Sequence, residues 1–168
     1  WRGQFCRDFT FFAVTALACA GPLLDVIVRS DLTWHADFST SIWVTITITM
    51  ALFLFFSAVV RNAWQLAPLL NVYMLILAVI AFAWQNIDTD AQAVTDGTEL
   101  LVLHISFAIT TYGLVTLAAV AGLAAFLQER ALKQKRKPIL DGILPSITDC
   151  DRLVSRFLMI GEAILGLG

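Results

Sequence analysis

Charged residues are scarce in this sequence. They make up 14% of the 168 residues, whereas apolar residues make up 59% and the mean hydropathy is +0.81. Soluble domains are about a quarter charged and about half apolar. A soluble fold of this length has too little interior to hide the excess apolar surface, so we expect that surface to face lipid. The net charge of -2 also argues against a nucleic-acid partner.

The sequence also lacks the short motifs that mark common catalytic and cofactor sites. Its three cysteines, Cys6, Cys19 and Cys150, form no C-x-x-C or C-x-x-C-H pattern, which excludes a covalent c-type haem site within this chain. Such isolated cysteines are typical of small buried hydrophobes. No P-loop, nucleophile elbow or zinc-ligand spacing is present. The sequence therefore assigns no catalytic residue and favours a role without catalysis.

Long apolar stretches are present instead, and they predict an all-α, polytopic transmembrane bundle of about five membrane segments in one domain, 1–168. Pro22 should kink the first helix or loosen its last turn, whereas Pro68 falls in the first turn of the third, where proline is tolerated. Because the sequence starts at Trp1 and stops at Gly168 within an apolar run, we expect the last segment to be truncated and the chain to be part of a longer protein. The predicted spans are about 9–28, 41–60, 64–84, 100–127 and 153–168.

The stretch 128–152 is predicted to be a basic loop between the last two spans. Pro138 should end the helix that continues beyond the fourth span. Ser146, with Asp149 three residues later, resembles a capping box, which predicts that the next helix begins there.

Basic residues fall on one side of the predicted bundle. Arg29 is the one Lys or Arg on the opposite side, which also carries the acidic stretch 86–99. The positive-inside rule places the basic side in the cytoplasm, so we expect a bacterial inner-membrane protein with a cytoplasmic N-terminus. The ten residues on the basic side are Arg2, Arg7, Arg61, Arg130, Lys133, Lys135, Arg136, Lys137, Arg152 and Arg156.

His104 is the leading candidate for chemistry, because it lies about one turn inside the fourth span at the predicted outer face. Neutral imidazole is a common metal ligand and a typical axial ligand of haem iron. The alternative is a histidine that hydrogen-bonds to a neighbouring helix or to interfacial water.

Small residues follow His104 at helical spacing. Ala108 and Thr111 lie on the same face, and Tyr112 lies to one side of it. Such a face admits either a neighbouring helix or a flat cofactor. His35 is predicted to lie on the same outer side, where it either helps to bracket a metal with His104 or is simply a solvated loop residue.

Three polar residues within the predicted spans suggest a weaker alternative, a small transporter or proton-linked channel. Asp25, Asn71 and Glu162 are costly to place in lipid and are therefore candidates for function. They form no visible line of ionisable groups, however. Asn71 is explained more simply by a hydrogen bond between helices.

Two segments carry a family resemblance. The stretch "LLVLHISFAITTYGLVTLAAVAGLAAFLQERALKQKRK" has a His early in a helix, Tyr112 eight residues later, a run of small residues and a basic end. The stretch "ILPSITDCDRLVSRFLMIG" has a Pro-containing loop and an acidic-basic helix start. Together they resemble the cytochrome c assembly membrane proteins (CcsA- and CcmC-related), and especially their HemX-like, YpjD-like branch. The resemblance covers roughly residues 40–168.

The resemblance implies what His104 does. In the haem-handling members, a His at this place ligates haem at the outer face, a second outer His follows later, and a Trp-rich loop lies between them. This sequence has no Trp-rich loop after His104, since its five Trp all lie at or before Trp84. The HemX-like branch also lacks that loop.

Two functions follow from the resemblance. The first is a membrane protein that binds or handles haem, as haem b, at the outer face in cytochrome c maturation or haem metabolism, with His104 as the ligand to iron. The second is a non-catalytic accessory or scaffold subunit of a larger membrane complex, or a regulator of haem biosynthesis. The expected partners are the lipid bilayer and, for either function, components of cytochrome c maturation or of that complex.

Overall fold

The computed structural model of the chain describes residues 9–29, 38–60, 62–84, 99–134 and 144–168. Every element assigned in these ranges is helical, which confirms the predicted all-α fold. The elements are α1 (Phe9–Arg29), α2 (Phe38–Val59), the short 3-10 helix η1 (Ala63–Leu66), α3 (Ala67–Trp84), α4 (Glu99–Lys133) and α5 (Ile147–Leu165).

Three of the described helices are long and apolar enough to cross a membrane. They are α2, the continuous η1–α3 segment and α4 from Leu103 onward. The apolar part of α1, Ala13–Leu24, is shorter. Helix α5 carries several charged residues over its first half and is not apolar enough over a sufficient length to count among these three helices. Its membrane span therefore stays a prediction.

Threonines are accommodated in these apolar helices by bonding to their own backbone. The hydroxyls of Thr45, Thr47 and Thr49 each donate to the carbonyl four residues earlier in α2, at 2.7–2.9 Å. In lipid no water is available to satisfy such a group, so the internal hydrogen bond removes most of the cost of burying it. This pairing explains how a threonine-rich stretch forms a membrane helix.

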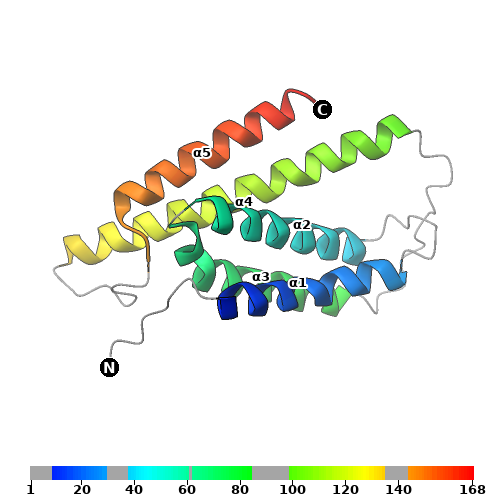
Figure 1. The fold of residues 1–168 in the computed structure, drawn as a ribbon, viewed down its shortest axis with the longest axis horizontal. Coiled ribbons are helices and arrows are strands. Elements are labelled where there is room, and N and C mark those ends of the chain that lie inside the picture. The colour runs from blue at the N-terminus through cyan, green and yellow to red at the C-terminus, as the bar shows by residue number, and fades with distance from the viewer. Residues whose placement is uncertain (1–8, 30–37, 61, 85–98, 135–143) are drawn as a thin grey trace.

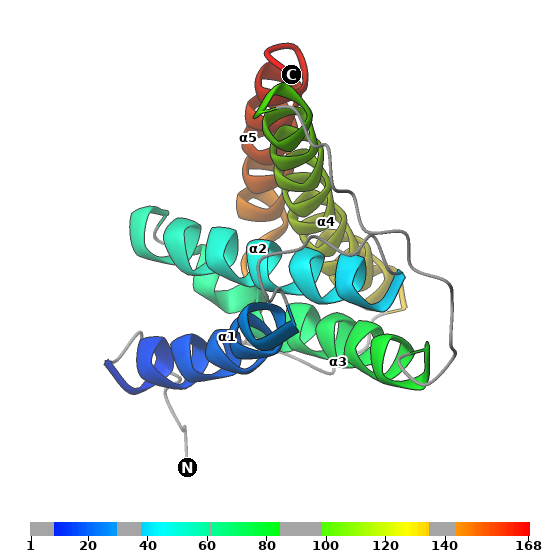
Figure 2. The ribbon, with the colours of Figure 1, turned by 90° about the vertical axis from the view of Figure 1, so that its right-hand side faces the viewer.

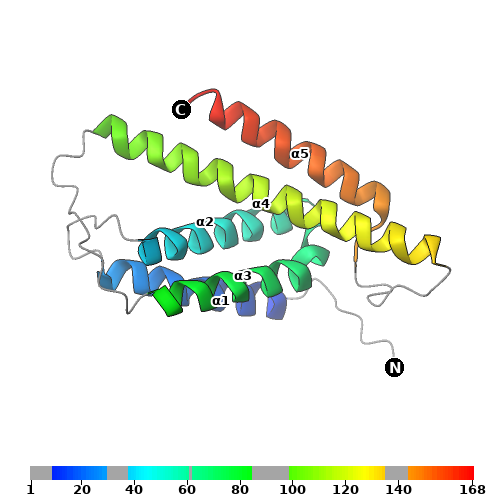
Figure 3. The same cartoon turned by 180° about the vertical axis from the view of Figure 1, so that it is seen from behind.

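The helices form two groups (Figure 1). Helices α1, α2 and α3 lie together, and α4 and α5 run antiparallel beside one another above them. Viewed along the long axis, the α4–α5 pair stands away from the α1–α3 group at the end where α4 begins (Figure 2). The view from behind shows the same divergence (Figure 3).

The core lies where the two groups cross. Phe53 of α2, Leu70 of α3, Leu117 of α4 and Phe157 of α5 are each almost completely buried there. The rings of Phe56 and Phe157 pack edge-to-face at 4.9 Å between their centroids. The burial of Phe157 against α2 fixes the position of α5 on the rest of the bundle.

One end of the α4–α5 pair, which we call the Asn62 end, is tied down by polar contacts. Asn62, in the turn before η1, donates to Asp149 Oδ2 at 2.9 Å. Ser146 caps α5 by accepting from the Asp149 backbone N–H, which confirms the predicted cap. Gln128 of α4 donates to the carbonyl of Pro145. The α2–α3 turn and the start of α5 therefore lie at the same end of the bundle.

Candidate functional site

The opposite end of the α4–α5 pair, which we call the His104 end, comprises residues 99–110 of α4 and 158–168. No described side chain of α4 before Thr111 is buried. His104 itself is exposed, in the second turn of α4. Its Nδ1 lies 2.8 Å from the main-chain oxygen of Gly168, beyond the end of α5. Residues far apart in the sequence are therefore joined at this site.

The end of α5 brings Gly168 to His104. Helix α5 closes at Gly166, whose N–H donates to the carbonyl of Glu162 at 2.9 Å. The next residue, Leu167, donates to the carbonyl of Ile164 at 3.1 Å. These two bonds turn the backbone so that Gly168 meets α4 beside Phe107 and His104.

The predicted neighbours of His104 lie in different surroundings. Ala108 is half-buried. Thr111 is buried, and its hydroxyl donates to the carbonyl of Phe107 at 2.9 Å. Tyr112 is 67% exposed, so its ring lies at the surface of the bundle. Thr111 therefore belongs to the packed side of α4 and Tyr112 to the outer side.

Two glycines mark places where the helices approach each other closely. A side chain on Gly113 would meet Leu52 Cδ1 at 2.8 Å and Thr49 Oγ1 at 3.3 Å, so α2 approaches α4 closely there. On α5, a side chain on Gly161 would meet Leu114 of α4 at 3.5 Å. Gly113 and Gly161 lie outside the face that the sequence singled out at Ala108 and Thr111, so the use of that face stays a prediction.

Several predicted site residues are not brought to His104 by the described structure. His35 lies outside the described residues, and so does the side chain of Asp25. Asn71 on α3 and Glu162 on α5 are both exposed. These two residues show no buried polar path of the kind that a transporter requires, so the transporter alternative gains no support.

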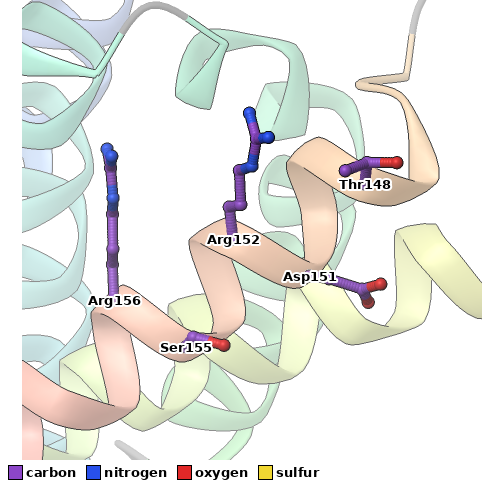
Figure 4. Close-up of a pocket in the computed structure, with 5 residues that line it drawn as sticks. All are labelled: Thr148, Asp151, Arg152, Ser155 and Arg156. Atoms are coloured by element: carbon purple, nitrogen blue, oxygen red, sulfur yellow. The ribbon is translucent and has the colours of Figure 1, made fainter.

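The exposed side of α5 carries a shallow, open hollow that the sequence did not single out. Arg152 and Arg156 extend from the helix one turn apart and in a similar direction (Figure 4). Both arginines are exposed. Thr148, Asp151 and Ser155 complete the lining. The hollow lies toward the Asn62 end of α5, away from His104.

Cys150, which lies in α5 next to Asp151 of that hollow, is fully buried on the inner side of the helix. Burial raises the pKa of its thiol to about 11, and the nearby Asp151 and Asp149 carboxylates add to that rise. The thiol donates weakly to the carbonyl of Pro145 at 3.6 Å. A thiol in these surroundings stays protonated and acts as a small hydrophobe, as predicted from the sequence.

The donor chemistry of the His104 end fits one axial ligand to haem iron. Within the described ranges, no group of three or more His, Cys, Asp or Glu side chains is close enough to hold a metal ion. Haem needs less from a protein, because the porphyrin supplies the equatorial nitrogens and one or two side chains complete the coordination. An exposed imidazole with one nitrogen already hydrogen-bonded meets that requirement.

Comparison with known proteins identifies the family. The model of the family described as "Cytochrome C assembly protein" matches residues 8–168. The chain belongs to the cytochrome c assembly protein family. An "Uncharacterized 28.8 kDa protein in nifR3-like 5'region" of Azospirillum brasilense is 42% identical to it over 169 residues, which is 99% of this chain. The chain spans 62% of the length of that relative. No solved structure matches the chain.

Family membership agrees with the resemblance carried by residues 100–161 and extends it almost to the start of the chain. The cytochrome c assembly match covers all five described helices. It supports a multi-pass membrane protein. The HemX-like branch, the ligand and the orientation in the membrane belong to the proposal below.

Proposed function

We propose that this chain is the part of a cytochrome c assembly family protein that binds or handles haem at the outer face of the bacterial inner membrane. His104 supplies an axial imidazole through Nε2. The observation that carries the proposal is the His104 imidazole itself, which is exposed and hydrogen-bonded through Nδ1 to a main-chain oxygen. Haem bound there supplies the redox-active and covalently attachable group, and the chain holds and presents it.

The surroundings of His104 suit a flat apolar ligand. Leu100 is 75% exposed and Leu103 is 52% exposed on the same segment of α4. Apolar side chains of this kind cover the face of a porphyrin, while the imidazole binds the iron. The predicted N-in orientation, which follows from the basic residues, places this segment at the outer surface. His35 stays a weak candidate for a second ligand.

Haem titration of the full-length protein in detergent tests this proposal. We expect a Soret band that is lost or strongly shifted in His104→Ala. His35→Ala is the matched control, because it removes the other histidine of the chain. If wild type and both variants show the same haem spectrum, or none binds haem, His104 is not the ligand.

A second candidate function is a non-catalytic accessory or scaffold subunit, of the HemX-like kind, and the exposed polar side of α5 favours it. Arg152 and Arg156 are too polar for lipid and available to another protein. Purification of the full-length protein under mild conditions separates the two functions. A stable partner lost in Arg152→Ala/Arg156→Ala, without any haem in wild type, supports the scaffold.

A further inference from the structure

The two arginines of the α5 hollow are available to bind an anion. Arg152 and Arg156 are exposed and extend from α5 in a similar direction (Figure 4). Neither guanidinium has a hydrogen-bond or ion-pair partner among the residues that the structure describes. A guanidinium presents several N–H donors in a planar fork that matches the oxygens of a phosphate group. The pair is therefore suited to a ligand that carries a phosphate.

The hollow lies near the level where the α2 span ends. Asn62, in the turn that follows α2, donates to Asp149 in the first turn of α5. At 1.5 Å per residue, Arg152 and Arg156 lie about 5 and about 10 Å further along α5 than Asp149. Arginine is costly within hydrocarbon but favourable beside anionic headgroups, which its flexible stem can reach. The two guanidiniums are therefore within reach of the headgroup layer.

The exposed side of α5 changes from charged to apolar just beyond Arg156. Met159, about one turn further on, is 71% exposed, and Leu158 is 46% exposed. Glu162 is the one charged residue in the second half of α5, and it follows the row of Asp151 about three turns later. A phospholipid has the same order of parts, a charged headgroup and then acyl chains. A free anion, by contrast, would use the arginines alone.

The net charge of the hollow favours one class of headgroup. Two arginines and one aspartate line it, so its net charge is one positive unit. Asp151 extends in a different direction from the arginines, so it does not neutralise either guanidinium (Figure 4). Phosphatidylglycerol carries one negative charge and balances the hollow, whereas phosphatidylethanolamine is neutral and adds an ammonium group. The hydroxyls of Thr148 and Ser155 supply donors and acceptors for the glycerol of the headgroup.

We propose that Arg152 and Arg156 bind the phosphate of an anionic phospholipid of the phosphatidylglycerol class, whose acyl chains follow α5 past Met159. This inference does not depend on haem or on His104. It assigns the first half of α5 to a membrane surface, which the positive-inside rule predicts to be the cytoplasmic one. It also competes with the scaffold function, because a bound lipid and a protein partner would occupy the same arginines.

Photo-labelling of the full-length protein in phosphatidylcholine nanodiscs tests the inference. The probe is a phosphatidylglycerol with a photoreactive acyl chain, and mass spectrometry of peptides identifies the labelled residues. Competition with unlabelled phosphatidylglycerol or phosphatidylethanolamine measures the preference for headgroup. The test variant is Arg152→Gln/Arg156→Gln. The matched control is Arg130→Gln/Lys133→Gln, which removes the same number of positive charges from exposed residues on the same predicted side.

We expect labelling of α5 around Met159 in wild type and in the control, with phosphatidylglycerol the better competitor. In Arg152→Gln/Arg156→Gln we expect half-maximal labelling to need about 30-fold more probe, the typical contribution of two arginines beside an anionic surface.

Equal labelling of α5 in the test variant and the control, whether kept or lost, overturns the inference. Equal competition by the two lipids overturns the assignment of the headgroup. Absence of labelling on α5 in wild type, because another part of the protein or a partner covers the arginines, overturns the inference and favours the scaffold function. If Arg152→Gln/Arg156→Gln cannot be purified, the labelled residues and the lipid competition in wild type still decide.

Discussion

The two ends of the α4–α5 pair are held in different ways. At the Asn62 end, the Phe56–Phe157 ring contact ties α5 to α2, and the Asn62–Asp149 bond ties it to the turn before η1. The Gln128–Pro145 bond ties the residue before the α5 cap to α4. At the His104 end, α4 and α5 lean away from the α1–α3 group and meet through the His104–Gly168 bond and the contact with Phe107. The first end is built for stability. The second leaves the His104 imidazole exposed, as the proposed haem site requires.

The largest expected effect of a substitution is at the crossing of the two groups. Phe157→Ala should lower the free energy of unfolding by about 3 kcal/mol, because it empties a site that is 1% exposed and removes the ring contact with Phe56. Thermal unfolding in detergent measures this change. Met159→Ala is the control, since Met159 is 71% exposed. Equal losses in the two variants would contradict the assignment of the core.

A smaller effect is expected where α2 and α4 touch. Gly113→Val should lower the free energy of unfolding by about 1–3 kcal/mol, because the added atoms meet Leu52 and Thr49. Gly122→Val on the same helix is the control, because the nearest atom, on Val154, lies 4.0 Å from a Cβ there. Thermal unfolding compares the two valine variants. A larger loss in Gly122→Val would show that α2 does not lie against Gly113.

The hydrogen bond between Asn62 and Asp149 should contribute less to the free energy of unfolding than the packing of Phe157 does. Asn62→Ala removes one hydrogen bond to a carboxylate that Ser146 also contacts, at 2.7 Å, so we expect a loss of about 1 kcal/mol. Thermal unfolding at pH 7 provides the measurement. Asn71→Ala, on the exposed side of α3, is the matched control and should leave stability unchanged. If Asn62→Ala is also neutral, the link does not hold the Asn62 end.

The smallest expected effect on stability is the pH dependence that arises from the Cys150 thiol. The pKa of this thiol is raised from 9.0 to about 11 in the folded protein, so folding favours its protonated form. The stability gained from it is present below pH 9 and is lost as the pH rises toward 11. In a Cys6→Ser/Cys19→Ser variant, alkylation at pH 8 should be about a hundredfold slower than for a free thiol. Rapid alkylation of the folded variant would show that Cys150 is not buried.

Much of the fold follows from the sequence, and much of the site does not. Apolar stretches predicted all-α structure, and Ser146 and Asp149 marked the start of α5. The sequence did not reveal that Gly113 faces Leu52 or that Gly168 reaches His104. Periodicity describes one helix at a time, whereas these contacts depend on how two helices are aligned. A glycine near the end of an apolar run gives no signal of its partner.

The proposed function depends most on His104 being the haem ligand. Replacement of His104 by glycine leaves a gap into which free imidazole can diffuse, so the measurement is haem binding by His104→Gly in the full-length protein with and without added imidazole. The proposed function predicts that the Soret band lost in His104→Gly returns when imidazole is supplied. A wild-type Soret band in His104→Gly without imidazole would contradict it.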